Sequence, residues 1–382
     1  MRHKYIYILF TSFGILFSCN TKEGGLQDHS DSPKNGEIRY AKRFAIQNEK
    51  GYKKIHVFGN RHSADTTATF LIYTDARPEQ TNSNNILIKA PCKKIAALSS
   101  IYARIFFELG ALDNVVAIDN LDYINCKAII EKHKKGQLAE ISKGIEINME
   151  QTIVLKPDII FSFGMGDWEK DRNRKVEHAK IPIAVSLDHL EQSPLARAEW
   201  IKFFAAFVNK SVEADYIFNE VERNYFEFKT SVNETTFRPT VFNEIKYSDS
   251  WYMPGGKSFM AQLLADAGAD YLWKDNTEFG SLPLTFEQVY AKAKEADYWI
   301  NLSTVKTKAE LLAYENRYME FKAFKNGNLY NNNRNTNAKG YSDYWETGMI
   351  FPDRILSDLI RIFHPEIKFT STTQMNYYQK IQ

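Results

Sequence analysis

A long stretch without helix breakers lies in the middle of the chain and constrains the fold more than any other feature. Residues 212–232 contain neither proline nor glycine. Ile217, Val221 and Phe228 recur at helical spacing and lie near one face. At a rise of about 1.5 Å per residue, a helix of about 21 residues is roughly 31 Å long. We therefore predict a rigid helix, within residues 210–236, that reaches from one lobe of the protein to another.

Strands and helices alternate on both sides of this helix. Before it, short apolar strands are predicted at 95–98, 115–118 and 159–163, with helices between them. After it, strands are predicted at 240–247 and 298–301, again with helices between. This alternation predicts parallel sheets covered by helices. The expected fold class is α/β, with two similar α/β lobes whose central parallel sheets are joined by the long helix.

A weak internal repeat supports two related lobes. Residues 108–111 read Glu-Leu-Gly-Ala, and residues 266–269 read Asp-Ala-Gly-Ala. Further along each half, an acidic residue precedes a predicted strand, at Asp158 and at Asp297. Each half thus has a helix that ends in a small-residue turn, and a later helix that leads into a strand.

The N-terminus has the pattern of a secretory signal. A basic start is followed by the apolar run Tyr5–Phe17, shorter than the about 20 residues that span a membrane. The run ends at Ser18-Cys19, which resembles a bacterial lipoprotein box with a lipidated cysteine. We predict a signal peptide at 1–18, a lipid anchor on Cys19 and a flexible tether at 19–36; a plain signal peptide with a chance cysteine is the alternative. The protein is then expected on the periplasmic face of a bacterial membrane, inner or outer.

The rest of the chain divides by its patterns. Alternating apolar and polar residues predict a small accessory β segment at 37–90. The first lobe is expected at 91–209 and the second lobe at 237–366. A polar and aromatic tail without clear structure is expected at 367–382.

Composition and motif spacing exclude several classes of protein. The chain has 49 Lys+Arg against 47 Asp+Glu, a net charge of +2, which excludes a polybasic nucleic-acid binder. The 8 histidines form no His-x-His or His-Glu-x-x-His motif, and no serine stands in Gly-x-Ser-x-Gly. We therefore predict neither an enzyme nor a protein with a resident cofactor or metal ion.

The two cysteines beyond the signal segment are predicted not to pair. Cys92 precedes the first predicted strand of the first lobe, and Cys126 follows the second. Parallel strands place these positions at opposite ends of the sheet, about 15 Å apart at about 3.3 Å per residue. A disulfide needs Cα atoms within about 7 Å of each other.

Several short segments, none specific alone, occur in an order that matches a known family. They are Lys94–Ser100, Glu108–Ala111, Val115–Ile118, Asn148–Gln151, Leu155–Ile160, Gly255–Ser258, Ala267–Ala269, Thr285–Val289, Lys325–Tyr330, Phe351–Leu356 and His364–Pro365. Together they span residues 94–366 and resemble the substrate-binding proteins of ABC importers for ferric siderophores, haem and vitamin B12. The resemblance implies two lobes joined by a rigid helix, a metal chelate held in the cleft between them, and a membrane permease as partner. A monomer is expected.

Ligands of open α/β sheets bind beyond the carboxyl ends of the strands, so we expect ligand contacts in the loops after the predicted strands. The first-lobe candidates are Ser99, Ser100, Tyr102, Asp119, Asn120, Tyr123, Met165 and Trp168. The alternatives are helix capping by the serines, a turn after the second strand and burial of the tryptophan. Haem iron would use a His or Tyr ligand, and none of the loops with candidate residues contains histidine.

The second lobe offers a group of aromatic residues in corresponding loops. Its candidates are Tyr247, Trp251, Tyr252, Arg334, Tyr341, Tyr344 and Trp345. The first three lie beyond a predicted strand and are suited to a platform for a flat chelate. The arginine is able to pair with an anionic chelate, with a solvated loop charge as the alternative. The resemblance aligns Tyr344 and Trp345 with an aromatic residue near the ligand.

The resemblance also implies carboxylates that dock onto the permease. Glu169 occupies the first-lobe docking position, with an ordinary helix N-terminal charge as the alternative. The second-lobe position falls near Lys257, where the chain has no acid. We therefore expect a lipid-anchored substrate-binding protein that delivers an iron(III)-siderophore-type chelate to a permease. Cobalamin or haem binding on the same scaffold, and a surface-associated capture lipoprotein not coupled to a permease, are the alternatives.

Overall fold

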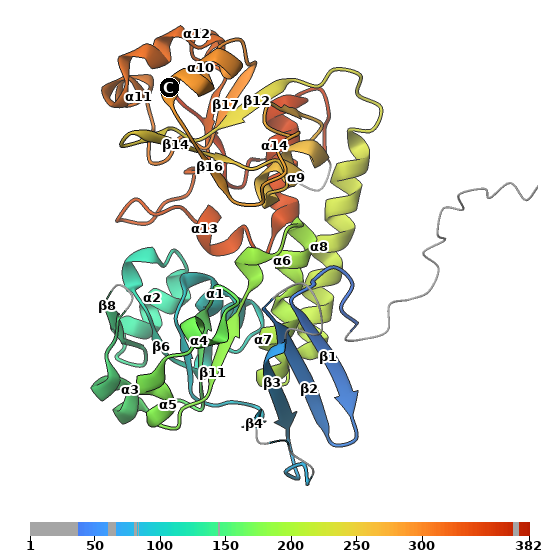
Figure 1. Cartoon of the computed structure of the whole chain (residues 1–382), viewed down its shortest axis with the longest axis vertical. Helices are drawn as coiled ribbons and strands as arrows, with labels where there is room; N and C mark the ends of the chain where they lie inside the picture. The colour runs from blue at the N-terminus through green and yellow to red at the C-terminus, as the bar shows by residue number, and fades with distance from the viewer. Residues whose placement is uncertain (1–36, 60–65, 80–81, 83, 144–145, 370–373) are drawn as a thin grey trace, which may run out of the picture. The chain divides into compact units, whose positions relative to one another are not determined.

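The structure is a computed structural model that describes residues 37–59, 66–79, 82, 84–143, 146–369 and 374–382 (Figure 1). The predicted signal peptide 1–18, the lipidation site Cys19 and the tether 19–36 lie outside the described residues. Contacts group the described residues into one unit. None of the helices in the described part of the chain is long and apolar enough to cross a membrane.

A four-stranded sheet forms the N-terminal part of the described chain, and this confirms the predicted β segment. Its strands, in order across the sheet, are β1 (Phe44–Glu49), β2 (Tyr52–Phe58), β3 (Thr66–Tyr73) and β4 (Asn85–Lys89). β3 and β4 are parallel, and the other neighbours are antiparallel. Phe70 of β3 packs edge-on against Phe203 and Phe207, so one face of the sheet is buried against helix α7 (Ile201–Phe207).

Two buried carboxylates hold the segment that leads into this sheet. Glu199 accepts hydrogen bonds from the backbone N–H groups of residues 39–41 at 2.7–2.9 Å. Glu191 accepts from the next two N–H groups, those of residues 42–43, both at 2.9 Å. Consecutive backbone amides that would otherwise be buried without partners are therefore bound to side chains of the segment that follows the first lobe.

The first lobe contains a parallel five-stranded sheet. Across the sheet the order is β11 (Ile183–Ser186), β10 (Ile159–Phe163), β5 (Ile95–Ala97), β6 (Val115–Ile118) and β7 (Ala139–Glu140). The helices of this lobe are α1 (Ser100–Glu108), α2 (Lys127–Lys134), α3 (Met149–Leu155), α4 (Trp168–Asp171) and α5 (Arg174–His178). A hairpin of β8 (Ser142–Lys143) and β9 (Glu146–Ile147) follows β7. The parallel pairing confirms the predicted strand–helix alternation.

The second lobe repeats this plan. Its main sheet has the order β15 (Asp270–Tyr271), β12 (Thr240–Asn243), β17 (Tyr298–Ile300), β18 (Leu329–Asn331) and β19 (Gln379–Lys380). A small antiparallel sheet consists of β13 (Lys246–Tyr247), β14 (Ser250–Pro254) and β16 (Ser281–Leu284). The helices are α9 (Phe259–Asp266), α10 (Phe286–Ala293), α11 (Lys308–Tyr314), α12 (Lys322–Asn326), α13 (Tyr344–Thr347) and α14 (Pro352–Phe363). The β15, β12, β17 and β18 strands are parallel.

The lobes are joined by α6 (Pro194–Glu199), α7 and the 21-residue helix α8 (Ser211–Ser231). α8 packs against α7 beside the first lobe and against α14 in the second, and Figure 1 shows it running alongside both. This is the predicted long connecting helix.

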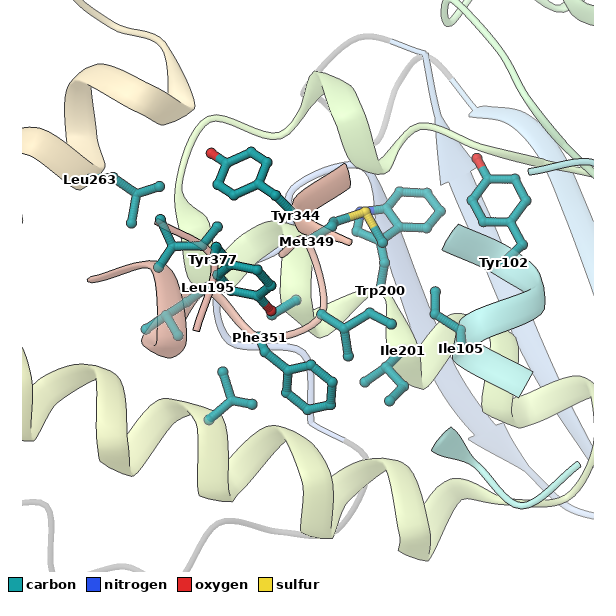
Figure 2. Packing of buried hydrophobic residues seen from close by; sticks show 14 of the residues in the cluster. Tyr102, Ile105, Leu195, Trp200, Ile201, Leu263, Tyr344, Met349, Phe351 and Tyr377 are labelled. Carbon is teal, nitrogen blue, oxygen red and sulfur yellow. The ribbon is translucent and has the colours of Figure 1, made fainter. Parts of the chain in front are cut away.

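One continuous hydrophobic core passes from lobe to lobe. Figure 2 shows part of it, where Leu195 and Trp200 of the connecting segment occur in one cluster with Tyr344, Met349 and Phe351 of the second lobe. Cys92 and Cys126 are also part of this cluster; both are buried and free. The lobes are therefore packed against each other and do not merely share a linker.

Two features of the second lobe differ from the sequence prediction. The strand predicted at 240–247 is broken after Asn243, because Glu244 adopts a left-handed backbone with φ of 64°. The tail predicted to lack clear structure instead adds β19 antiparallel to β18. Tyr377 and Tyr378 are buried, because Asp358 accepts hydrogen bonds from both of their backbone N–H groups.

Helix α10 begins with a capping box. The Thr285 hydroxyl accepts a hydrogen bond from the Gln288 N–H at 3.2 Å, and the Gln288 side chain accepts from the Thr285 N–H at 2.8 Å. We expect Thr285→Ala to lower the free energy of unfolding by about 1 kcal/mol, because an N-cap acceptor is lost. Urea unfolding measures this. Thr277→Ala, in an exposed loop, is the control, and an equal effect of both substitutions would contradict the capping role.

Candidate functional site

A cavity of about 470 Å³ lies between the two lobes. This volume is within the range of about 300–1,000 Å³ that is typical of small-molecule sites. Its polar groups include Asp188, His189, Arg197, Glu244 and Asn301, and its apolar wall includes Ile101, Phe259, Met260, Phe279, Tyr344, Trp345 and Met349. Both lobes and the connecting helix α6 thus contribute to one site.

Most of the polar groups lie just beyond the carboxyl ends of strands. Asp188 and His189 begin the short 3₁₀ turn that follows β11. Glu244 follows β12, and Asn301 follows the adjacent strand β17. Ligands of parallel α/β sheets bind at this edge, so the topology itself directs these side chains to the cavity.

Asp188 is a buried acceptor at the first-lobe wall. It accepts hydrogen bonds from the Ser186 hydroxyl at 2.5 Å and from the Tyr102 hydroxyl at 3.1 Å. Two donors of this kind orient the carboxylate and offset part of its desolvation.

Arg197 is fixed by the main chain next to the cavity. Its guanidinium donates to the carbonyl oxygens of His189 at 2.7 Å and of Glu191 at 3.1 Å. It also lies 4.3 Å from the ring centroid of Phe259, a cation–π contact between α6 and α9 of the second lobe. Arg197 therefore supplies a positive charge in a defined orientation.

Burial changes the charge state of two cavity groups. It raises the pKa of Glu244 to about 7, so this carboxyl is about half ionised at neutral pH. Burial is also the main reason why the pKa of His189 is lowered, which keeps its imidazole mostly neutral at pH 7. Among the described residues, no group of three or more His, Cys, Asp or Glu is placed to hold a metal ion.

Two predicted site residues, Tyr344 and Trp345, line the cavity. Trp345 is 62% exposed, whereas Tyr344 is 4% exposed, so the indole is the more accessible ring. Both residues belong to the loop and short helix that follow β18.

Trp251 was predicted as a ligand platform, and this prediction is wrong. Its side chain is fully buried among the aromatic rings of the second lobe, because alternate residues of β14 point in opposite directions. The neighbour Tyr252 therefore points outward and is half exposed. Tyr247 is also exposed, and neither tyrosine lines the cavity.

The residues near the start of α1 lie behind the cavity or beside it. Tyr102 is buried in the core and contacts the cavity only through its hydrogen bond to Asp188, so its predicted direct contact is wrong. Ser99 is the N-cap residue of α1 without a side-chain capping bond, and Ser100 is the first residue of the helix. Both serines are half-buried outside the cavity lining, to which Ile101 contributes instead.

The loop after β6 contacts the other lobe. Tyr123 packs edge-on against Tyr341 with 4.6 Å between ring centroids. The Asn337 amide donates to the carbonyl oxygens of Asp122 at 2.8 Å and of Ile124 at 3.1 Å. Both predicted tyrosines therefore take part in an interlobe contact. Asn120 caps its own turn by accepting from the Asp122 N–H.

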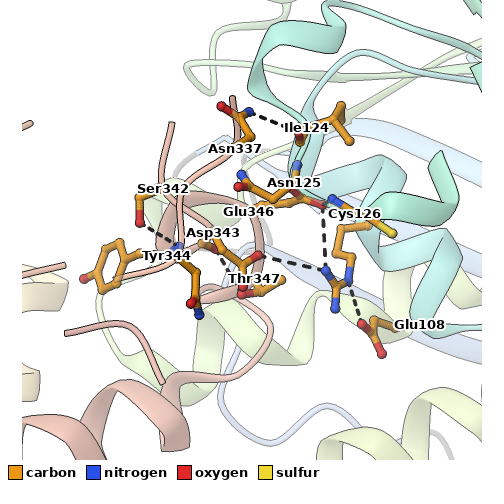
Figure 3. Close-up of polar contacts among 12 residues, drawn as sticks. Glu108, Ile124, Asn125, Cys126, Asn337, Ser342, Asp343, Tyr344, Glu346 and Thr347 are labelled. Atoms are coloured by element: carbon orange, nitrogen blue, oxygen red, sulfur yellow. Dashed lines mark hydrogen bonds and ion pairs between the residues drawn. The ribbon is translucent and has the colours of Figure 1, made fainter. Parts of the chain in front are cut away.

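A buried carboxylate completes this interlobe contact (Figure 3). Glu346 of α13 accepts hydrogen bonds from the backbone N–H groups of Asn125 and, at 3.1 Å, Cys126. Arg104 of α1 lies 3.8 Å from the same carboxylate and 2.6 Å from Glu108. The N-terminus of α2 thus faces a negative charge from the second lobe, which is a favourable arrangement.

The remaining predicted residues lie elsewhere. Asp119 lines a separate first-lobe pocket of about 520 Å³, and Arg334 lines a polar second-lobe pocket of about 460 Å³. Met165 is exposed. Glu169 is exposed and pairs with Arg172 at 3.0 Å. The side chain of Trp168 lies outside the described residues.

Sequence reasoning missed most of the polar cavity groups. His189 in particular lines the cavity, although none of the loops with predicted candidate residues contains histidine. The same rule that selected the other loops points to Asp188 and His189, because they follow the apolar strand β11. Glu244 lies within a segment that was predicted as one continuous strand, so it was not recognised as following a strand end. Arg197 lies on a helix and not in a loop after a strand, so the loop rule did not select it.

A sequence profile of the family described as periplasmic binding protein matches residues 95–334. An uncharacterized lipoprotein of Methanocaldococcus jannaschii is 30% identical over 243 residues, 63% of this chain and 56% of that protein. A second uncharacterized lipoprotein of this organism is 28% identical over 387 residues, 95% of this chain and 92% of that protein. The chain thus spans little more than half of the first relative's length but nearly all of the second's.

Solved structures share the fold at low identity. A possible iron-binding periplasmic solute-binding protein of Staphylococcus epidermidis has a TM-score of 0.55 and 18% identity, with 72% of this chain and 99% of that chain covered. A periplasmic heme-binding protein of Pseudomonas aeruginosa has a TM-score of 0.54 and 14% identity, covering 72% and 94%. A periplasmic vitamin B12 binding protein of Vibrio cholerae has a TM-score of 0.51 and 14% identity, covering 72% and 97%.

Proposed function

Because the chain belongs to the periplasmic binding protein family, we propose that it captures a metal chelate in the cavity between its lobes and delivers it to the permease of an ABC importer. Proteins of this family are substrate-binding transport proteins and not enzymes. The observation that carries the proposal is the interlobe cavity, which combines aromatic walls with a few oriented polar groups.

The proposed ligand is an iron(III)-siderophore-type chelate. Trp345 and Tyr344 offer ring surfaces for the organic part of the complex, and Arg197 offers a fixed positive charge. Since no cluster of metal-ligating side chains exists among the described residues, the metal would be held by its own chelator rather than by the protein.

Haem is the second candidate, and His189 favours it. A neutral imidazole at the cavity wall is able to ligate haem iron. Two results would favour haem over a ferric siderophore as the ligand. Bound haemin should show the absorption spectrum of histidine ligation, and His189→Ala should abolish that spectrum.

Membrane attachment through Cys19 and permease docking through Glu169 remain part of this proposal. Two relatives are described as lipoproteins, which supports the anchor. Glu169 is exposed on α4, where a partner protein is able to reach it. Labelling with a radioactive fatty acid, with Cys19→Ser as control, tests the anchor, and pull-down of the permease with Glu169→Ala tests the docking.

Ligand binding is tested by calorimetric titration with ferric siderophores, haemin and cobalamins. We expect Trp345→Ala to weaken binding about 5- to 30-fold, because the loss of an aromatic contact removes on the order of 1–2 kcal/mol of binding free energy. Tyr247→Ala, which removes an exposed aromatic residue outside the cavity, should leave the affinity unchanged. Absence of binding for all chelates would refute the proposal, and unchanged affinity in Trp345→Ala would refute the site.

A further inference from the structure

Glu244 is held in a strained backbone conformation at the cavity wall. It follows β12 with a φ of 64°, and Asn301 follows the adjacent strand β17 with a φ of 59°. Residues other than glycine adopt this left-handed conformation against a steric penalty, and such residues cluster at functional sites. Two of them at the ends of adjacent parallel strands direct both side chains to the same cavity.

The carboxyl group of Glu244 has no partner among the residues that the structure describes, neither a hydrogen-bond donor nor a cation in an ion pair. Hydrogen-bond donors near this carboxyl group bond to other acceptors. Arg197 donates to main-chain carbonyl groups. The hydroxyl of Tyr271 donates to a main-chain carbonyl, and that of Tyr378 to Asn301 at 2.8 Å.

Glu244 is only partly exposed, so its unpaired carboxyl group is costly unless a ligand satisfies it. Burial of a carboxyl group without a donor disfavours its charged form, which is why the pKa of Glu244 is raised to about 7. A ligand that brings a donor or a positive charge would restore the ionised form. A ligand with an anionic edge at this point would meet a second acid and be repelled.

We infer that Glu244 determines ligand specificity in the interlobe cavity by binding an ammonium group on the periphery of the captured chelate. This inference rests on the proposed function and narrows it to chelates with a cationic edge. Arg197, on the connecting helix α6, then serves the electron-rich chelating groups of the same ligand.

Two ferric trihydroxamates of the same ligating chemistry provide the test. Ferrioxamine B is open and carries a terminal ammonium group, whereas ferrioxamine E is a ring without one. We expect the full chain to bind ferrioxamine B more tightly. Glu244→Gln should weaken ferrioxamine B about 10- to 100-fold, the value of a hydrogen bond to a charged group, and change ferrioxamine E less than twofold. Glu278→Gln, which removes an exposed acid next to the cavity residue Phe279, is the matched control and should change neither.

The pH dependence of ferrioxamine B affinity distinguishes the contribution of Glu244 from those of the neighbouring titratable groups. Affinity of the unmodified protein for ferrioxamine B should rise between pH 6 and 8, because more molecules carry the Glu244 carboxylate. The other groups around it are Asp188, His189, Arg197 and the phenols of Tyr271, Tyr344 and Tyr378, and all of them are retained in Glu244→Gln. The rise should therefore be largely lost in Glu244→Gln.

The outcomes distinguish this inference from the proposed function. Equal weakening of both ferrioxamines in Glu244→Gln, or no weakening, would overturn the inference. Binding of haemin or a cobalamin, together with no binding of either ferrioxamine, would also overturn the inference. This result would leave the proposed function intact. If no chelate binds, both fail. Thermal unfolding should show that Glu244→Gln is at least as stable as the unmodified protein, since it removes an unpaired carboxyl group.

Discussion

Replacement of Trp251 by alanine is expected to lower the free energy of unfolding by about 3–5 kcal/mol, the usual cost of removing a buried aromatic side chain from a core. The indole is fully buried. Its ring centroid lies 5.6 Å from those of Trp299 and Tyr318, and its Nε1–H donates to the Asn243 carbonyl at 2.9 Å. The substitution removes these contacts, leaves a cavity and deprives a buried carbonyl of its donor.

Denaturant unfolding followed by circular dichroism measures this loss. Tyr252→Ala is the matched control, because Tyr252 is the next residue of the same strand and is half exposed. We expect the control to change stability by less than about 1 kcal/mol. Similar effects of the two substitutions would mean that Trp251 does not pack in the core, and would restore it as a candidate for ligand contact.

Glu199→Ala should also cost about 3–5 kcal/mol, the range for breaking a buried ion pair by removal of one partner. Glu199 is fully buried and lies 3.5 Å from the Lys202 ammonium, which in turn lies 3.2 Å from Asp215. It also accepts hydrogen bonds from the backbone amides of residues 39–41. Its removal leaves these donors without their acceptor and detaches the entry to the N-terminal sheet.

Chemical unfolding, combined with limited proteolysis, is the measurement for Glu199. In Glu199→Ala the segment 37–43 should become a preferred cleavage site. Glu213→Ala removes the partly exposed ion pair with Lys210 and should cost no more than about 1 kcal/mol. If Glu199→Ala behaves like this control, the carboxylate does not hold the N-terminal sheet in place.

The elements that sequence reasoning predicted well are those with strong local signals. The strands 115–118 and 159–163 are short apolar runs, and they occur in the structure with the same bounds. The capping box of Thr285 and Gln288 sets the start of α10 in the sequence and in the structure alike. The helix α8 is also defined locally, by the absence of breakers over its length.

The site was predicted less well, because its residues depend on contacts between distant segments. The break at Glu244 is invisible in the sequence, since apolar residues continue on both sides of it at Phe242 and Ile245. The position of Trp251 after a strand does not reveal that a further strand, β14, turns it inward. Tyr377 and Tyr378 are buried through contacts with other segments, because Asp358 accepts from their backbone and their hydroxyls bond Thr347 and Asn301.

The strand β19 has a consequence for the order in which the ligand site is assembled during synthesis. The Tyr378 hydroxyl holds the amide oxygen of Asn301 at the base of the cavity, and these residues are 77 positions apart. At ordinary elongation rates, Tyr378 leaves the ribosome about 4–15 s after Asn301. Even after the last parallel strand, β18, has been made, a nascent second lobe still lacks the residue that orients Asn301, so the pocket becomes complete only when the segment around β19 has been made.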